Sequence, residues 1–242
     1  MRIVSLVPSL TELIIDFGLQ SSLVGRTRFC IHPEPAVGKI PIVGGTKNPR
    51  LDKIRDLKPD LIIANREENR KEDVEQLKEH ATVFLTDIAT IEEALLAIYE
   101  LGQTLDVAEK ADELIENINR ELDRIPEEAP LRVAYLIWQK PWMTVGRDTY
   151  IHSVLSRWKM DNVFKHETRY PKITLEKLAG KNPGYILLSS EPFPFKEKHK
   201  DVIREACPDS NVLLVDGQWF SWYGSRMLPS FKKLNTLRRA IS

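Results

Sequence analysis

The residue types best suited to chemistry in this sequence are a thiol and an imidazole, Cys30 and His32, separated by one isoleucine. A thiolate beside an imidazole can ligate zinc or pair as nucleophile and general base. Two ligands do not make a zinc site, and no second Cys/His pair follows at a suitable spacing. We therefore expect a packed or ligand-lining role for both residues and no bound metal, and we keep catalysis by Cys30 and His32 as the alternative.

Residues 44–47, Gly-Gly-Thr-Lys, form a second candidate motif. The run is glycine-rich and ends in a basic residue, but it lacks the full phosphate-loop pattern. We interpret it as a loop that lines a ligand cleft and that offers Lys47.

Large aromatic side chains are concentrated in the second half of the chain. The five tryptophans are Trp138, Trp142, Trp158, Trp219 and Trp222. Trp219, Phe220, Trp222 and Tyr223 follow an expected strand that ends at Asp216, and they lie too close together in sequence for all of them to face one core. Core packing is one reading of the cluster; with Trp138 and Trp142 at another strand end, a stacking surface for a large planar ligand is the one we favour.

Alternating apolar strands and amphipathic helices would position these residues. Ser9 and Glu12 form a capping pattern, and Gly18 is expected to end the helix that they open. Such alternation predicts an α/β protein with mostly parallel sheets. The expected strands are 3–7, 61–64 and 82–85, and the expected helices are 9–17, 72–79 and 90–105.

An internal repeat divides the chain into two similar lobes. The run Leu-Asp-Lys-Ile at 51–54 returns as Leu-Glu-Lys-Leu at 175–178, an offset of 124 residues. A helix with apolar residues at helical spacing is expected between the repeats. We therefore predict a three-layer α/β lobe over 1–105, a single long helix over 106–125, and a second α/β lobe over 126–242, with the ligand cleft between the lobes. In open α/β sheets ligands bind beyond the carboxyl ends of the strands, which places Pro8, Cys30, His32 and the aromatic loops at the cleft.

Composition excludes several classes of function. The 242 residues carry 35 basic and 35 acidic side chains, so the net charge is zero, whereas nucleic-acid binders usually have a basic excess. No apolar run approaches the roughly 18 residues of a membrane span, and no secretory leader is present, which favours a cytoplasmic monomer as the sequence is written. Two cysteines cannot form a disulfide framework.

The repeat also suggests a function for the run of charged residues over 66–73. Its ordinary interpretation is a solvated helix start, but moving Asp73 forward by 124 residues lands on Glu197. Each lobe thus presents carboxylates at the same relative position on its rim. Such rims suit the basic residues of a symmetric partner.

Three features together resemble a known family. Residues 2–9 read Arg-Ile-Val-Ser-Leu-Val-Pro-Ser and continue with Thr-Glu-Leu at 11–13, residues 57–64 read Leu-Lys-Pro-Asp-Leu-Ile-Ile-Ala, and one helix is expected between the lobes. The chain resembles, over essentially its whole length, the substrate-binding proteins of ABC importers for iron-siderophores, haem and vitamin B12, the helical-backbone metal receptors. The vitamin B12-binding type is the most similar subgroup.

The resemblance implies that a corrinoid, haem or ferric siderophore is held without chemistry, as a ligand and not a cofactor, in a periplasmic or lipid-anchored protein. The family's aromatic position after the second strand corresponds to Phe29, and this chain has Gln218 where the family's ligand loop carries aspartate and Trp222 where it carries arginine. The ligand loop corresponds to Gln218, Trp219, Phe220, Ser221 and Trp222. The glutamates that dock on permease arginines correspond to Glu72 or Glu68 and to Glu197. Basic candidates for ligand carboxylates or phosphate are Arg28, Lys47, Arg66, Arg147, Arg169 and Arg226.

Two other classes of function stay open at this point. An enzyme acting on a corrinoid or metal chelate would use Cys30 and His32 for thiolate or axial-ligand chemistry. An adaptor would use the acidic rims alone and bind no small molecule.

Overall fold

The computed structural model describes residues 1–241, which form two compact units. Unit 1 comprises Met1–Ile88, Glu92–Asn117 and Tyr223–Met227. Unit 2 comprises Ala89–Ile91, Ile118–Trp222 and the C-terminal residues from Leu228. Each unit is described by itself below.

The centre of unit 1 is a four-stranded parallel sheet with the strand order β2-β1-β3-β4. Every residue of β3 is buried, as expected of a strand covered on both faces. Because all four strands run in the same direction, the loops that follow them share one edge of the sheet. The strands are β1 (Ile3–Ser5), β2 (Leu23–Arg26), β3 (Leu61–Asn65) and β4 (Thr82–Thr86).

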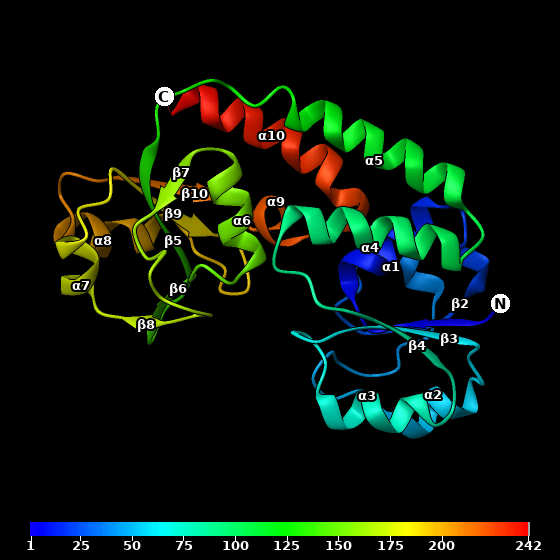
Figure 1. The fold of residues 1–242 in the computed structure, drawn as a ribbon. Helices are drawn as coiled ribbons and strands as arrows, with labels where there is room; N and C mark the ends of the chain where they lie inside the picture. The colour runs from blue at the N-terminus through cyan, green and yellow to red at the C-terminus, as the bar shows by residue number, and fades with distance from the viewer. Residues whose placement is uncertain (242) are drawn as a thin grey trace. The chain divides into compact units, whose positions relative to one another are not determined.

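Helices cover both faces of this sheet (Figure 1). On one face, Val4 and Ile62 of the strands pack against Ile54 of α2 and Leu77 of α3 in one buried cluster. Two short 3-10 helices, η1 (Gln20–Ser22) and η2 (Val37–Lys39), flank β2. The helices of the unit are α1 (Pro8–Asp16), α2 (Leu51–Asp56), α3 (Lys71–Lys78) and α4 (Ile91–Thr104).

Unit 2 contains a second sheet, in which parallel and antiparallel pairs are mixed. β9 lies between β10 and β5 with all three strands parallel, while β6 and β8 continue the sheet antiparallel and β7 pairs with β5. The strands are β5 (Leu131–Trp138), β6 (Trp142–Thr144), β7 (Met160–Asn162), β8 (Lys172–Ile173), β9 (Tyr185–Ser189) and β10 (Asn211–Val215).

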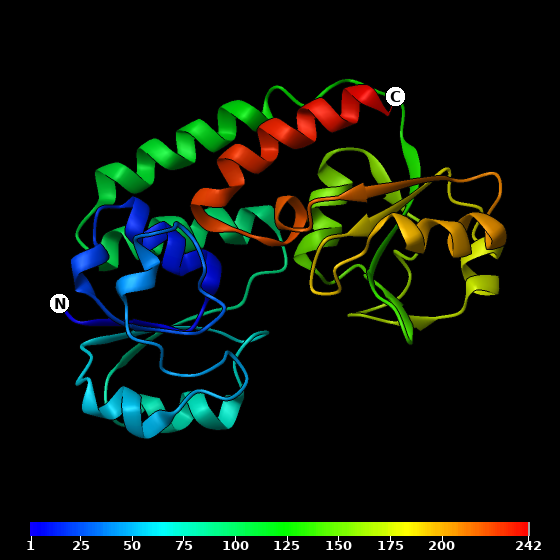
Figure 2. The ribbon, with the colours of Figure 1, turned by 180° about the vertical axis from the view of Figure 1, so that it is seen from behind.

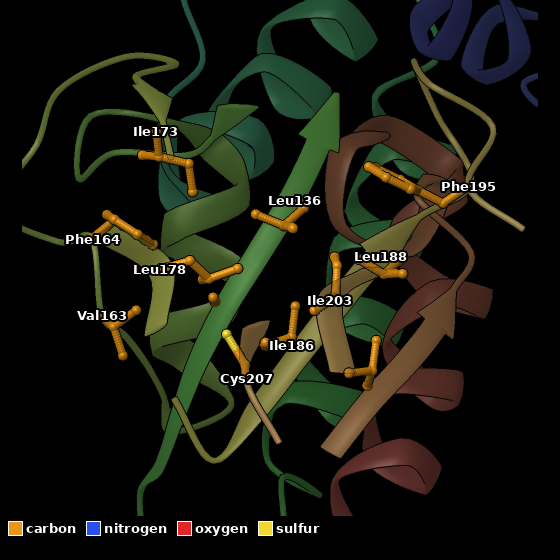
Figure 3. Packing of buried hydrophobic residues seen from close by; sticks show 12 residues of the cluster. Leu136, Val163, Phe164, Ile173, Leu178, Ile186, Leu188, Phe195, Ile203 and Cys207 are labelled. Carbon is orange, nitrogen blue, oxygen red and sulfur yellow. The ribbon is translucent and has the colours of Figure 1, made fainter. Parts of the chain in front are cut away.

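The core of unit 2 lies between this sheet and two helices. Leu136, Ile186 and Leu188 of the strands pack against Leu178 of α7 and Ile203 of α8, as Figure 3 shows. The helices of the unit are α6 (Tyr150–Arg157), α7 (Leu175–Gly180), α8 (Lys200–Ala206), the single turn α9 (Gln218–Ser221) and most of α10 (Met227–Ala240). The 3-10 helices η3 (Glu197–His199) and η4 (Gly224–Arg226) precede α8 and α10.

The long helix expected between the repeats is α5 (Ala108–Leu122), which follows α4 in the chain (Figure 2). Its buried side chains include Ala111, Ile118 and Leu122, at the helical spacing seen in the sequence. The boundary between the two units falls inside α5, after Asn117. In unit 2, Asn235 of α10 donates to the backbone carbonyl of Glu121 at 3.0 Å and joins α10 to the last turn of α5.

One local expectation is wrong. Ser9 does not cap α1, because the helix begins one residue earlier at Pro8 and its N-cap residue is Val7. Proline is well suited to a first helical position, since its fixed φ matches the helix and its missing N–H would have had no partner there. Gly18 has a φ of +83° just after α1, in the left-handed conformation that ends many helices.

Candidate ligand-binding site

In unit 1, the candidate residues lie in the loops that follow β1, β2 and β3. Pro8 is partly exposed and begins α1. The loop over 44–48 is tied to the loop after β3, because Asn69 donates to the carbonyl of Thr46 at 3.0 Å and Lys47 donates to the carbonyl of Glu67 at 2.5 Å. These bonds hold two loops together at the carboxyl edge of the sheet.

Phe29 is the prominent aromatic residue of this edge. Its side chain is 49% exposed, which is unusual for a large apolar ring. The guanidinium of Arg28 lies 5.1 Å from the ring centroid, within cation–π distance. Arg66, in the loop after β3, is exposed and forms an ion pair with Asp87 at 3.0 Å. The edge therefore offers one exposed ring and several cationic groups.

Cys30 is fully buried. Its sulfur lies 3.1 Å from the hydroxyl of Thr11 and 3.2 Å from that of Thr27. Burial is the main influence on the thiol and raises its pKa above the ordinary value. A nucleophilic cysteine needs the opposite, a lowered pKa and access to solvent. His32 is partly buried.

In unit 2, the loops after β9 and β10 are joined by hydrogen bonds. The backbone N–H of Gly217 donates to Ser190 Oγ at 2.9 Å, and Glu191 Oε1 accepts from Ser221 Oγ and from Trp222 Nε1, both at 2.8 Å. The segment over 216–222 is called the ligand loop below. Its conformation is set by the neighbouring loop as well as by its own turn.

The four aromatic residues near the ligand loop divide into two kinds. Trp219 and Trp222 are partly exposed, whereas Phe220 is buried against Tyr135 with ring centroids 5.0 Å apart. Tyr223 is also buried and belongs to unit 1. Gln218 and Ser221 are partly buried. Two of the four aromatic residues are therefore packed in a core, and the other two keep ring surface that a ligand could stack on.

Trp138 and Trp142 flank the tight connection between β5 and β6. Trp138 is 38% exposed and meets Phe193 edge to face at 5.7 Å. Trp142 is stacked on Phe195, with 4° between the ring planes, and packs against the hydrophobic core of the unit. The sequence predicted the same stacking role for both tryptophans, but Trp138 is exposed and Trp142 is packed against the core.

The basic candidates have different local partners. Arg226 lies in unit 1 and makes a two-pronged ion pair with Glu12 of α1, with Nε 2.9 Å from Oε2. Arg169 is exposed, and its guanidinium lies 5.5 Å from the ring centroid of Tyr170. Arg147 is exposed as well. The pair with Glu12 gives Arg226 a clear structural role between α1 and η4.

Sequence reasoning did not single out Glu191. The side chain is partly buried, and burial raises its pKa above the ordinary value despite the hydrogen bonds from Ser221 and Trp222. The only sequence signal is an acidic residue shortly after a buried strand, in the loop that carries Phe193 and Phe195. Its partners lie about 30 residues further along the chain, so spacing could not reveal them.

With the geometry of the loops established, comparison with known proteins places the chain. The family of periplasmic binding proteins matches residues 3–206. The chain belongs to this family. This periplasmic binding protein is 25% identical to a vitamin B12-binding protein of Pectobacterium carotovorum subsp. carotovorum (strain PC1), over an alignment that covers 100% of the chain and 89% of the relative.

Two further proteins similar to this periplasmic binding protein differ in what their names state. An uncharacterised ABC transporter substrate-binding lipoprotein of Bacillus subtilis (strain 168) is 29% identical, over 77% of this chain and 62% of the relative. The periplasmic haem-binding protein of Roseiflexus sp. RS-1 has a TM-score of 0.84 at 17% identity, covering 99% of this chain and 98% of that one. The latter similarity confirms the two-lobe α/β fold expected from the sequence.

The candidate docking glutamates of this periplasmic binding protein lie at the starts of helical segments. Glu72 is exposed in the first turn of α3, and Glu68 is partly buried in the preceding loop. The Glu197 side chain is 73% exposed at the start of η3 and lies 2.9 Å from Lys200. Asp73, the formal repeat partner of Glu197, is buried and paired with Arg70. Each unit therefore has an exposed candidate docking glutamate, Glu72 in unit 1 and Glu197 in unit 2.

Within residues 1–241, no three or more His, Cys, Asp or Glu side chains are grouped as a metal site requires. Over the same residues, no helix combines the length and the apolarity that a membrane crossing demands.

Proposed function

We propose that this protein is the substrate-binding component of an ABC importer and that it binds a corrinoid such as cobalamin without altering it, with haem and then a ferric siderophore as the next ligands to test. The relatives support this assignment, because they include a vitamin B12-binding protein, a haem-binding protein and an ABC transporter lipoprotein. All three are binding proteins by name.

The observation that carries the proposal is the pair of partly exposed tryptophans in the ligand loop. Trp219 and Trp222 keep ring surface accessible while Phe220 anchors the same loop in the core. Flat indole surfaces that are held in place lose little entropy when a planar ligand stacks on them. Phe29, half exposed beside Arg28, gives unit 1 a similar combination of ring and cation.

The basic side chains near these loops suit the peripheral groups of such ligands. Haem carries carboxylates and cobalamin carries a phosphate, and exposed arginine or lysine side chains bind both groups through charge-assisted hydrogen bonds. Lys47 and Arg66 are exposed in loops at the carboxyl edge of the first sheet, and Arg169 is exposed in the segment before β8. We assign to them the peripheral groups of the ligand, and to the aromatic residues its planar ring.

The enzymatic alternative receives less support from the surroundings of Cys30. A thiol that is fully buried and has a raised pKa is a poor nucleophile and a poor metal ligand. The hydroxyls of Thr11 and Thr27 explain its position as local packing. We therefore assign no catalytic step to Cys30 or His32.

The partner and the compartment follow from the same proposal. A substrate-binding component delivers its ligand to a membrane permease, and the exposed Glu72 and Glu197 suit basic residues on two permease subunits. The similarity to a lipoprotein and to a periplasmic protein supports an extracytoplasmic site of action.

Calorimetric titration of the purified protein with cyanocobalamin, haemin and a ferric catecholate chelate tests the ligand assignment. We expect saturable binding of at least one of them at a ratio near one, with an unchanged ligand after release. Trp219→Ala should weaken that binding by about tenfold, because the variant loses the apolar ring surface that the ligand would bury as well as the stacking itself, which is worth about 0.5–1.5 kcal/mol beyond that area.

The matched control is Tyr99→Ala, which removes an exposed aromatic side chain from α4. This variant should bind as the unaltered protein does. Absence of binding to all three probes at tens of micromolar would contradict the proposed function, and so would equal effects of the two substitutions.

A further inference from the structure

Glu191 occupies an unusual position for an acidic side chain. It lies two residues after the end of β9, and its side chain is partly buried beside the ligand loop. Buried carboxylates are costly unless hydrogen bonds compensate for the lost water. The bonds that compensate here come from the ligand loop, where the side chains of Ser221, Trp222 and Gln218 hydrogen-bond to the carboxyl.

The backbone of Glu191 is itself anchored to the core. Tyr135, fully buried in β5, donates its hydroxyl to Ser189 Oγ at 3.0 Å. Ser189 Oγ in turn donates to the carbonyl of Glu191 at 2.6 Å and lies 3.3 Å from its N–H. The carboxylate therefore projects from a fixed point on the central part of the sheet.

A single oxygen of Glu191 accepts the hydrogen bonds from Ser221 and Trp222. Oε1 lies 2.8 Å from Trp222 Nε1 and 2.8 Å from Ser221 Oγ. Ser221 Oγ is also 2.9 Å from the carbonyl of Gly217, but a carboxylate is the stronger acceptor for its one proton. The bond to Trp222 fixes the rotation of the indole about its side-chain torsions.

The bond also decides what the Trp222 ring offers to a ligand. The indole has one donor, and it is directed to Glu191. What remains accessible on Trp222 is apolar ring surface, suited to a flat ring system and unsuited to hydrogen bonding.

We propose that Glu191 is the positioning residue of the ligand loop, which holds Trp222 in a preformed orientation for stacking on a planar ring of the ligand. Its effect on affinity rests on the proposed function, whereas its effect on the loop does not. A preformed loop binds with less loss of conformational entropy than a mobile one.

Hydrogen–deuterium exchange without any ligand tests the positioning role. Glu191→Ala should accelerate exchange in peptides that cover 216–222, because the loop loses its hydrogen bonds to the carboxylate. Glu191→Gln should restore slow exchange, since the amide oxygen can occupy the place of Oε1. Glu197→Ala is the control, because it removes an exposed carboxylate from the same connection between β9 and α8.

Titration with cyanocobalamin and haemin supplies the second measurement. Relative to the unaltered protein, Glu191→Ala should weaken binding of the favoured probe by about tenfold, in line with the loss of hydrogen bonds to a charged group. Glu191→Gln should retain affinity within a factor of about three. Thermal unfolding of each variant, followed by circular dichroism, checks that the fold persists.

The two measurements separate the two proposals. Faster exchange in the alanine variant with no binding of either probe, even by the unaltered protein, would support the positioning role and contradict the cobalamin and haem assignment. Exchange over 216–222 that is unchanged in Glu191→Ala would overturn the positioning role. Should Glu191→Ala unfold, Trp222→Phe, which removes only the indole donor and part of the ring, must itself accelerate exchange in the loop; slow exchange there would overturn the proposal equally.

Discussion

The buried groups at the edges of the two sheets serve packing, and Cys30 illustrates this most directly. Its thiol fills space between Thr11 and Thr27 and receives no solvent. Arg226 is comparable, since its two-pronged pair with Glu12 joins α1 to η4 within unit 1. Cys30 and Arg226 thus have structural roles, whereas Trp219 and Trp222 are partly exposed and are the rings that we propose for ligand stacking.

Cys30→Ala is expected to destabilise the protein and to spare ligand binding. Removing a buried side chain leaves a small cavity and two hydroxyls with one partner fewer, at a cost of about 1–2 kcal/mol. Chemical denaturation measures this change, and calorimetric titration should show affinity within a factor of about two of the unaltered protein. Cys30→Ser, which keeps a polar atom for Thr11 and Thr27, is the control. A folded alanine variant that no longer binds would show that the thiol acts in binding.

Glu191 makes the stability of the protein depend on pH in a defined direction. Burial raises its pKa in the folded state above the ordinary value of 4.5, so the ionised form costs more in the folded protein than in the unfolded chain. The favourable contribution of the neutral carboxyl is then fully present below pH 4.5 and is lost as the pH rises through the raised pKa. Asp216 acts in the same sense, because its nearby charge also raises the pKa of Glu191.

Glu191→Gln should remove this dependence. We expect the melting temperature of the variant, compared with that of the unaltered protein, to improve steadily between about pH 4.5 and pH 7, since the amide never ionises. Differential scanning calorimetry across this range provides the comparison, with Glu197→Gln as an exposed control. A difference in melting temperature between the variant and the unaltered protein that stays constant from about pH 4.5 to pH 7 would contradict the assignment of a raised pKa to Glu191.

At the scale of elements, the sequence predicted those whose signal is local. The buried run of β3 and the apolar spacing of α5 were both anticipated, because burial on two faces or along one stripe leaves a periodic trace. α10 was not anticipated, since Pro229 near its start resembles a breaker although the first turn of a helix tolerates proline. The short strands β6, β7 and β8 carry too few residues for a period to appear.

The candidate site shows the same division between local and long-range information. The aromatic richness of the ligand loop was evident, but spacing alone could not show that Phe220 is buried while Trp219 and Trp222 are partly exposed. That choice depends on Tyr135, which contacts Phe220 from a strand about 85 residues earlier. Glu191 was missed for the same reason, because its role exists only once two loops meet.

The close fit between the two loops predicts a specific sensitivity at Gly217. A Cβ there would lie 2.3 Å from Ser189 Oγ and 2.6 Å from Glu191 Cγ, so Gly217→Ala must displace the network that holds the ligand loop. We expect a loss of about 1–3 kcal/mol in stability, typical of overpacking, and faster hydrogen exchange over 216–222. Gly180→Ala at the end of α7 is the control, since its Cβ would meet nothing within 4 Å and should leave stability within about 1 kcal/mol. Equal stability of the two variants would contradict this account of the loop.

At the scale of the whole molecule, the net charge is zero, but exposed acidic and basic side chains occur at different places on the chain. The 35 acidic and 35 basic side chains cancel, yet each unit carries an exposed glutamate at the start of a helical segment, Glu72 on α3 and Glu197 on η3. The exposed cations Arg28 and Arg169 lie beside the rings of Phe29 and Tyr170. Ligand recognition and partner recognition can therefore use opposite charges, and a substitution can affect one without the other.

The double variant Glu72→Lys with Glu197→Lys tests this separation. If Glu72 and Glu197 dock on permease arginines as proposed, both contacts become repulsive, and we expect at least a tenfold loss of ATP-driven cobalamin uptake into proteoliposomes that contain the cognate permease and ATPase. Affinity for free cyanocobalamin should stay within a factor of about two, because neither glutamate lies in the aromatic loops. The control is Glu79→Lys with Glu205→Lys, an identical charge change at exposed positions near the ends of α3 and α8. Because the control carries the same net charge, equal losses in both variants would attribute the effect to overall charge and contradict docking through Glu72 and Glu197.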